Sequence, residues 1–201
     1  MMVVVSKDIV KPASNQNMYS VFRYSSFSDE VKSIYSHQKR SFGSRKVRFE
    51  RGLEFFVVKK KGRFVSYFWL VKPEKNRFID ECAINVQLTK DAVWLRDIYV
   101  AENERGKNHF GNILNQVIEK YYPHIEKIYS DFEVSNYPSF KAHEKYGFRS
   151  VGRLNSILLF KKILIRKIDK LEKMVITGYN QSKPIIVIDE EYKIYKEANL
   201  G

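Results

Sequence analysis

Residues 98–111 read IYVAENERGKNHFG, which joins a short apolar segment, an Arg-Gly pair and the start of an amphipathic stretch. This order predicts a strand, a turn at Arg105 and Gly106, and the first turn of a helix. The N-terminus of a helix carries unpaired backbone N–H groups and the positive end of the helix dipole, so it binds phosphate groups well. The segment therefore predicts a site that can hold a diphosphate.

A second segment, NYPSFKAHEKYGF at residues 136–148, follows in the same chain. It predicts a helix that is capped by Asn136 or Ser135 and that ends at Gly147. It also holds His143. An unperturbed histidine has a pKa of ~6.5, so it can donate a proton near neutral pH or relay one through water. A histidine that packs beneath the helix is the equally weighted alternative.

Together the two segments resemble the acyl-coenzyme A site of the GNAT acetyltransferase superfamily. The usual forms there are R-G-x-G-x-G at the loop and N-x-x-[AS]-x-x-x-Y-E-K-x-G-F downstream. The resemblance covers roughly residues 53–160. It implies an α/β (α+β) fold: a single domain with a mixed, mostly antiparallel central sheet flanked by helices, and a short C-terminal extension. It also implies an N-acetyltransferase that moves an acetyl group from acetyl-coenzyme A to the primary amine of a small molecule. The acceptor would be of the amino-sugar or amino-acid type, and it would attack directly within a ternary complex, without a metal.

The resemblance also implies roles for individual residues. The family's tyrosine, the proposed acid that protonates the leaving thiolate, falls on His143. Asn108 and Phe110 replace two loop glycines. Phe110 either faces the core, as its place on the apolar stripe suggests, or crowds the donor, since a side chain there approaches the pyrophosphate. The implied contacts to coenzyme A are Ile98, Tyr99, Val100, Arg105, Gly106, Lys107, Asn108, His109, Phe110, Gly111, Asn136 and Ser139.

Acyl transfer to an amine also needs a proton acceptor, because an alkyl ammonium of pKa ~10 stays protonated near neutral pH. Many relatives use a glutamate on the strand before the loop; here Arg96 stands where such a glutamate often lies, and Asp97 follows it. Strand alternation directs these two side chains to opposite faces. The candidate bases are Asp97 and Glu81, the latter acting through ordered water. Arg96 either binds a carboxylate or phosphate on the acceptor or forms a surface salt bridge.

Length and composition agree with one folded domain. The chain has 201 residues, of which 44% are hydrophobic and 14% aromatic. We expect the domain at residues 1–168, with the first 26 or so assigned least clearly, and an extension of unknown role at residues 169–201. The single cysteine, Cys82, excludes an intrachain disulfide and a thiolate metal cluster. No apolar run approaches the ~20 residues of a membrane span, and we expect a cytoplasmic protein.

The net charge is +13, from 36 Lys and Arg against 23 Asp and Glu. Basic clusters at Arg45, Lys46, Arg48 and Arg51 and at two later sites suit a polyanion, although lysines spread over solvated faces give the same count. Nucleic acid is therefore a less favoured partner than a small amine. Three alternatives remain open: acylation of a macromolecular amine such as aminoacyl-tRNA or a protein, a catalytically degenerate acyl-coenzyme A-binding module, and a longer acyl donor on an acidic carrier protein. A homodimer is also open.

Strands and helices alternate along the chain in the pattern expected to position these residues. A capped helix begins at Ser28, and a clean helical stripe follows the Arg-Gly loop. The expected elements are, in order, a strand at 19–24, a helix at 28–37 followed by a loop, a hairpin of 53–58 and 64–71 with Gly62 in its turn, strands at 78–86 and 92–100, the helix bearing Phe110, Ile113, Leu114, Val117, Ile118 and Tyr121, a strand at 128–134, the helix after Asn136, a hairpin at 151–168, and an extra strand or docking element near the end.

Overall fold

The computed structural model describes residues 2–9, 19–35, 43–79, 84–107, 109–159, 162–169, 175–178, 186–188 and 194–196. The chain divides into two compact units. Unit 1 comprises residues 1–9, 73–94 and 125–201, and unit 2 comprises residues 10–72 and 95–124. Strand β7 (Ala92–Val100), which matches its expected bounds, begins in unit 1 and continues into unit 2.

The sheet of unit 2 has the strand order β7-β4-β3-β2. Strands β3 (Leu53–Lys60) and β4 (Arg63–Val71) form the hairpin that the sequence predicts. Lys61 and Gly62 link them with φ values of 48° and 75°, the conformation that a two-residue hairpin turn requires. Strand β2 (Tyr19–Tyr24) pairs antiparallel with β3.

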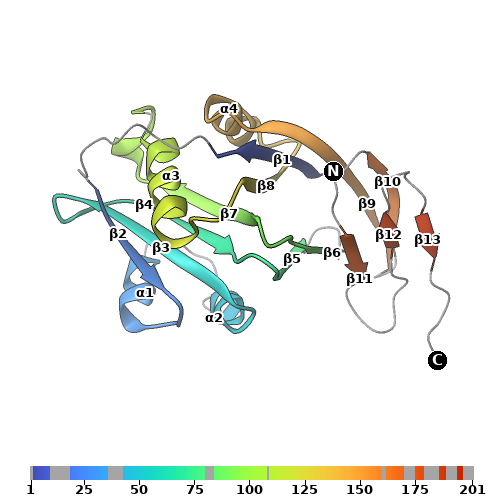
Figure 1. Ribbon diagram of the computed structural model, residues 1–201, viewed down its shortest axis with the longest axis horizontal. Coiled ribbons are helices and arrows are strands. Elements are labelled where there is room, and N and C mark those ends of the chain that lie inside the picture. The colour runs from blue at the N-terminus through green and yellow to red at the C-terminus, as the bar shows by residue number, and fades with distance from the viewer. Residues whose placement is uncertain are drawn as a thin grey trace. The chain divides into compact units, whose positions relative to one another are not determined.

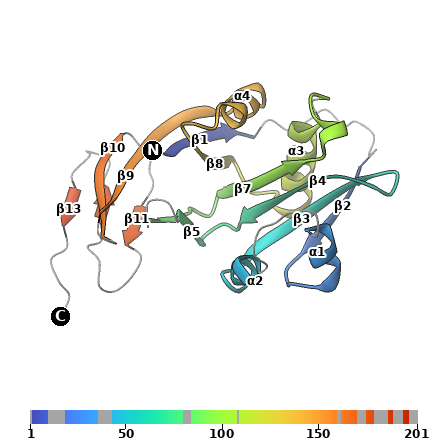
Figure 2. The ribbon, with the colours of Figure 1, turned by 180° about the vertical axis from the view of Figure 1, so that it is seen from behind.

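Helices cover both faces of the unit 2 sheet, with α1 and α2 on one side and α3 on the other (Figure 2). Helix α1 (Asp29–Ile34) begins as predicted, since the Ser28 hydroxyl accepts a hydrogen bond from the Val31 N–H at 3.3 Å, but it ends earlier than expected. Helix α2 (Gly43–Glu50) corrects the prediction of a loop in this region. Its Arg45 is buried, and the guanidinium carbon lies 3.6 Å from the centre of the Tyr35 ring.

The alternation of β4 decides which aromatic side chains meet which helices. Trp69 donates its indole N–H to the hydroxyl of Tyr35, at the end of α1, at 2.7 Å. Phe68, on the opposite face, meets Phe110 of helix α3 (Phe110–Tyr121) edge-on, with the ring centres 5.5 Å apart. The predicted apolar stripe of α3 is buried at Phe110, Ile113, Leu114, Val117 and Ile118.

The main sheet of unit 1 has the strand order β10-β9-β1-β8-β7. Strand β1 (Met2–Asp8) lies between β8 (Lys127–Glu133) and β9 (Arg149–Leu159) and is antiparallel to both, as Figure 1 shows in dark blue. The sequence interpretation did not assign this strand, although a run of valines marks it. Strand β10 (Lys162–Asp169) completes the predicted closing hairpin with β9.

Unit 1 also contains smaller sheets. The prediction of a single strand at residues 78–86 is wrong. This region contains two antiparallel strands, β5 (Asn76–Ile79) and β6 (Ile84–Gln87), in which Ile79 lies opposite Ile84. Strand β11 (Val175–Gly178) pairs with β6. Near the chain end, β12 (Ile186–Ile188) pairs with β13 (Ile194–Lys196), where an extra strand was expected.

Helix α4 (Tyr137–Lys145) has the ends that the sequence predicts. The Asn136 side chain accepts a hydrogen bond from the Ser139 N–H at 3.1 Å, and Gly147 follows the helix with a φ of 82°. In the part of the chain that the structure describes, no helix is both long enough and apolar enough to cross a membrane.

Candidate functional site

The loop between β7 and α3 leads into the first turn of α3. A short 3₁₀ turn (Glu102–Glu104) follows β7, and Gly106 then takes a φ of 76°. The first α3 hydrogen bond runs from the Ile113 N–H to the His109 carbonyl at 3.1 Å, and the His109 side chain does not cap the helix. The N–H groups of the first helical turn, at residues 110–112, have no acceptor within the helix itself, and a helix end of this kind can bind a phosphate group. A Cβ added at Gly106 would meet nothing within 4 Å, so backbone conformation explains the glycine.

The cations of this loop are paired with carboxylates of the same loop. Arg105 donates from Nε to the Val100 carbonyl at 3.1 Å, and its Nη1 lies 3.8 Å from a Glu102 carboxylate oxygen. Lys107 donates from Nζ to Glu104 Oε1 at 3.0 Å. Both cations are well exposed. A bound phosphate would therefore compete with these internal carboxylates for the loop cations.

The side chain of His109 faces Glu104 and Tyr19. Its Nε2 lies 3.6 Å from Glu104 Oε2, and its ring centre is 5.5 Å from that of Tyr19. Burial is the main cause that lowers the pKa of His109; the nearby Lys60 lowers it further, while Glu104 opposes the shift. Because the His109 side chain faces these two residues, His109 would contact a ligand at the helix end through its backbone.

Phe110 directs its ring into the core of unit 2. Its side chain is 4% exposed and packs against Phe68. The ring therefore lies away from the helix end, where the backbone N–H of Phe110 lies. Asn108, the other departure from the glycine pattern, lies outside the described residues.

Strand β7 is irregular just before the loop. Among the described non-glycine residues, φ is positive at Lys61, Glu74 and Asp97, and only Asp97, at 53°, lies within a strand. Side chains therefore do not simply alternate between the two faces of the sheet on either side of Asp97. The direction of the Asp97 side chain is instead given by its contact with α2. Arg96 and residues 98–100, which complete the strand, are all partly buried.

Asp97 forms an ion pair that sequence reasoning missed. Arg48 of α2 lies 2.5 Å from it, Nη1 to Oδ2, and the two side chains are 16% and 30% exposed. The guanidinium also lies 5.3 Å from the centre of the Trp69 ring. The spacing of Arg45 and Arg48 suits one helix face and could have indicated this placement, but the segment was interpreted as a loop.

In unit 1, His143 is buried between aromatic rings and uses both ring nitrogens. Nδ1 lies 2.7 Å from the Ser139 carbonyl and 3.3 Å from its hydroxyl, and Nε2 lies 2.8 Å from the Ser130 hydroxyl. A carbonyl only accepts, so Nδ1 carries the proton and Nε2 accepts from Ser130. Phe132 and Phe148 have ring centres 5.0 and 5.1 Å from that of His143. Burial lowers the pKa of His143, opposed by the Ser139 carbonyl and Asp131, which favours the neutral ring.

We expect His143 to make the fold less stable in acid. Above pH ~6.5 the ring is neutral in both the folded and the unfolded chain. As the pH falls below that value, the unfolded chain takes up the proton first, because the pKa in the fold is lowered, so the free energy of unfolding decreases. Urea unfolding between pH 7 and 5 measures this loss, and His143→Gln should flatten the pH dependence. The exposed His124→Gln variant is the control. Equal slopes for wild type and His143→Gln would contradict the assignment.

The structure thus groups the predicted residues within each unit. In unit 2 the loop from Arg105 and the N-terminus of α3 follow the strand that holds Asp97, and in unit 1 Asn136, Ser139 and His143 share α4. Glu81 lies outside the described residues. No group of three or more His, Cys, Asp or Glu side chains suited to a metal ion occurs among the residues described.

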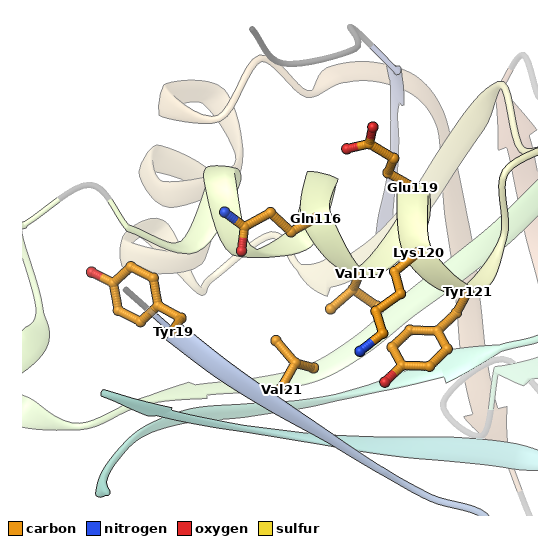
Figure 3. A pocket seen from close by; sticks show the side chains of 7 residues that line it. All are labelled: Tyr19, Val21, Gln116, Val117, Glu119, Lys120 and Tyr121. Carbon is orange, nitrogen blue, oxygen red and sulfur yellow. The ribbon is translucent and has the colours of Figure 1, made fainter. Parts of the chain in front are cut away.

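A small pocket in unit 2 is separate from these residues. It has a volume of about 230 Å³ and lies between β2 and α3, with Lys120 and Tyr121 extending from the helix toward the sheet (Figure 3). None of the predicted site residues lines it. Its lining residues are Tyr19, Val21, Gln116, Val117, Glu119, Lys120 and Tyr121.

Comparison with known proteins identifies a family. The profile of the Acetyltransferase (GNAT) family matches residues 16–148, more than half of the chain. A comparison with curated proteins finds no match.

Solved structures share the fold at low sequence identity. A conserved protein of unknown function from Staphylococcus epidermidis has 10% identity and a TM-score of 0.51, with 74% of this chain and 57% of that chain covered. A complex of AAC(6')-Iy with the bisubstrate analogue CoA-S-monomethyl-acetylneamine has 13% identity and a TM-score of 0.50, with 72% and 97% covered. A GNAT-family acetyltransferase from Colwellia psychrerythraea has 15% identity and a TM-score of 0.47, with 74% and 52% covered. The chain thus spans little more than half of the first and third of these proteins, and likenesses at such identities concern the fold alone.

Proposed function

The chain belongs to the acetyltransferase (GNAT) family, and from this premise we propose that it transfers an acetyl group from acetyl-coenzyme A to the primary amine of a small molecule. The observation that carries the proposal is the turn at Arg105 and Gly106, which leads into the N-terminus of α3 inside the matched residues. The α/β fold agrees with this family. The neighbour that is complexed with a coenzyme A-linked acetylneamine gives an example, within this fold, of a small amine as acceptor.

Donor binding begins at the loop. The N–H groups of residues 110–112, with Gly106, would hold the diphosphate, and Arg105 and Lys107 would exchange their loop carboxylates for phosphate oxygens. The core position of Phe110 supports this, since its ring is directed away from the helix end. The family resemblance implies further donor contacts within each unit, from the backbone of residues 98–100 in unit 2 and from Asn136 and Ser139 in unit 1.

When bound, the donor supplies a thioester carbonyl to the amine. The amine nitrogen forms the amide bond to the acetyl carbon, the C–S bond breaks, and the thiolate takes up a proton. The attacking ammonium gives up two protons in all, so one proton is released per turnover. The chain must therefore provide a proton acceptor near the amine and a donor near the sulfur.

We assign the proton acceptor to Asp97. Its place on β7, directly before the donor-binding segment, supports this role. The Arg48 guanidinium lies 2.5 Å from Asp97 and competes with the amine for the carboxylate oxygen, so Asp97 would contact the amine once Arg48 binds another anion. Glu81, acting through water, remains the second proposed base.

We assign the proton donor to His143 acting through Ser139. The Ser139 hydroxyl is 3.3 Å from the protonated Nδ1, and its side chain is less buried than the imidazole. Ser130 donates to Nε2 and so keeps the proton on Nδ1. In this step the imidazolium form of His143 would pass its Nδ1 proton to the Ser139 hydroxyl, the hydroxyl would pass its own proton to the thiolate, and the ring would return to the neutral form that its burial favours.

The basic surface supports a second candidate, acylation of a macromolecular amine such as aminoacyl-tRNA. A net charge of +13 would favour binding to a polyanion with a strong dependence on salt. We place the protein in the cytoplasm under either proposal.

Thiol release measured with acetyl-coenzyme A and a panel of small amines tests the proposal. We expect turnover with at least one amine, dependent on Asp97. Binding of acetyl-coenzyme A without turnover of any amine would instead support a binding module. Turnover only with aminoacyl-tRNA would support the macromolecular acceptor.

A further inference from the structure

We infer that the acceptor is a zwitterion, an amine with a carboxylate close to it, and that Arg48 and Asp97 separate to bind its two charges. This inference rests on the proposed function, because it concerns the acceptor of the same acetyl transfer. The starting observation is the ion pair of 2.5 Å between α2 and β7.

Both side chains of the pair are partly exposed to solvent. The Arg48 side chain is 16% exposed and that of Asp97 30% exposed, whereas the neighbouring Trp69 is fully buried. An ion pair at such a partly exposed position adds little to the stability of a fold, because solvent screens it. Stability alone therefore gives a weak reason for placing these two charges here.

The backbone at Asp97 is strained at the residue that contacts Arg48. Its φ of 53° lies in the left-handed region, which a non-glycine residue in a strand rarely adopts. Such strain persists where the surroundings enforce it, and it collects at binding and catalytic sites. Here the strained residue is the carboxylate that meets Arg48, directly before the donor-binding segment of β7.

The surroundings hold Arg48 in place for an incoming anion. Its guanidinium lies 5.3 Å from the centre of the Trp69 ring, and Phe49 packs on the same ring at 4.8 Å. The Trp69 ring is fixed in turn by its hydrogen bond to Tyr35. An arginine ordered in this way binds a carboxylate through two parallel N–H groups with little further loss of freedom.

Charge balance selects the ligand. A zwitterion replaces one ion pair by two, because its carboxylate binds Arg48 and its ammonium binds Asp97. A simple amine or an amino sugar would bind Asp97 and make no contact with Arg48, so it would form one charge pair where a zwitterion forms two. The exchange also places the ammonium against the carboxylate that takes its proton before attack on the thioester.

Matched acceptors test the inference. Acetyl-coenzyme A is combined with phenylalanine or phenethylamine, and with alanine or ethylamine, which differ only in the carboxylate. We expect kcat/KM to favour the carboxylate member of each pair by about 100-fold. Arg48→Met should abolish this preference, so that the two members of each pair have equal kcat/KM. Lys46→Met, which removes an exposed cation from the same helix, should leave the preference unchanged.

A loss of folding can be distinguished from a failure of the inference, and a failure of the inference from a failure of the proposed function. The double variant Arg48→Met/Asp97→Asn removes both charges. If it is more stable to thermal unfolding than Arg48→Met, the single variant is destabilised because it leaves the Asp97 carboxylate without Arg48. Equal kcat/KM within each pair for wild type, or a preference that survives Arg48→Met, would overturn the inference while leaving the proposed acetyl transfer intact. If no amine is turned over, the proposed function fails. Calorimetric binding of phenylalanine then decides the inference: binding lost in Arg48→Met supports it, and no binding to wild type overturns it.

Discussion

Replacing Phe110 by alanine should lower the free energy of unfolding by about 3–5 kcal/mol, the usual cost of emptying a buried phenylalanine site. The ring is 4% exposed, starts the apolar stripe of α3 and packs edge-on against Phe68. Urea unfolding of the purified variant measures the change. Tyr137→Ala, which removes an aromatic ring that is 62% exposed, should change stability by no more than about 0.5 kcal/mol.

The same variant tests whether this ring affects the donor. Because it points into the core, Phe110→Ala should bind acetyl-coenzyme A within about twofold of wild type under conditions where it is folded. A stability loss below about 1 kcal/mol would place the ring outside the core. A tenfold gain in affinity would show that the ring crowds the donor, as the glycine pattern of the family suggests.

Reversing the charge at Arg105 should weaken acetyl-coenzyme A binding by about 100-fold. A hydrogen bond to a charged group contributes about 1.5–3 kcal/mol, and the new carboxylate adds repulsion toward the phosphates, so a loss near 2.7 kcal/mol is expected. Arg105 is exposed and contacts Val100 and Glu102 of its own segment, so Arg105→Glu should fold normally. Calorimetric titration measures the affinity.

The matched control is Arg63→Glu, in which the same change of charge is made at an exposed position in the β3–β4 hairpin. If both variants weaken binding equally, the overall charge and not the loop attracts the donor. If neither does, the phosphate site lies elsewhere.

Elements with local signals could be predicted from the sequence. Ser28 and Asn136 cap the helices that they were expected to cap, and Gly62 lies in the turn of the expected hairpin. Each of these features depends on a few adjacent residues. The order of strands and helices between residues 92 and 148 could also be predicted, because the resemblance to the family is strongest there.

Features held together by distant contacts could not be predicted. Helix α2 has no acidic residue in its first turn, and its Arg45 packs on Tyr35 of another segment. The Arg48–Asp97 pair joins residues far apart in the chain, and it depends on a φ value that alternation does not foresee. For His143, the spacing gave the position, but the burial that lowers its pKa comes from packing against Phe132 and Phe148.

Strand β1 has a consequence for the order in which the protein folds during translation. It leaves the ribosome long before its partners do, since Val3 lies opposite Phe132 on one side and Arg153 on the other. Most of the chain must therefore be synthesised before this strand can pair. Pairing over such sequence separations is slow, and the valine run of the nascent chain stays exposed to aggregation meanwhile. Synthesis of this protein should thus depend on chaperones until β9 has emerged.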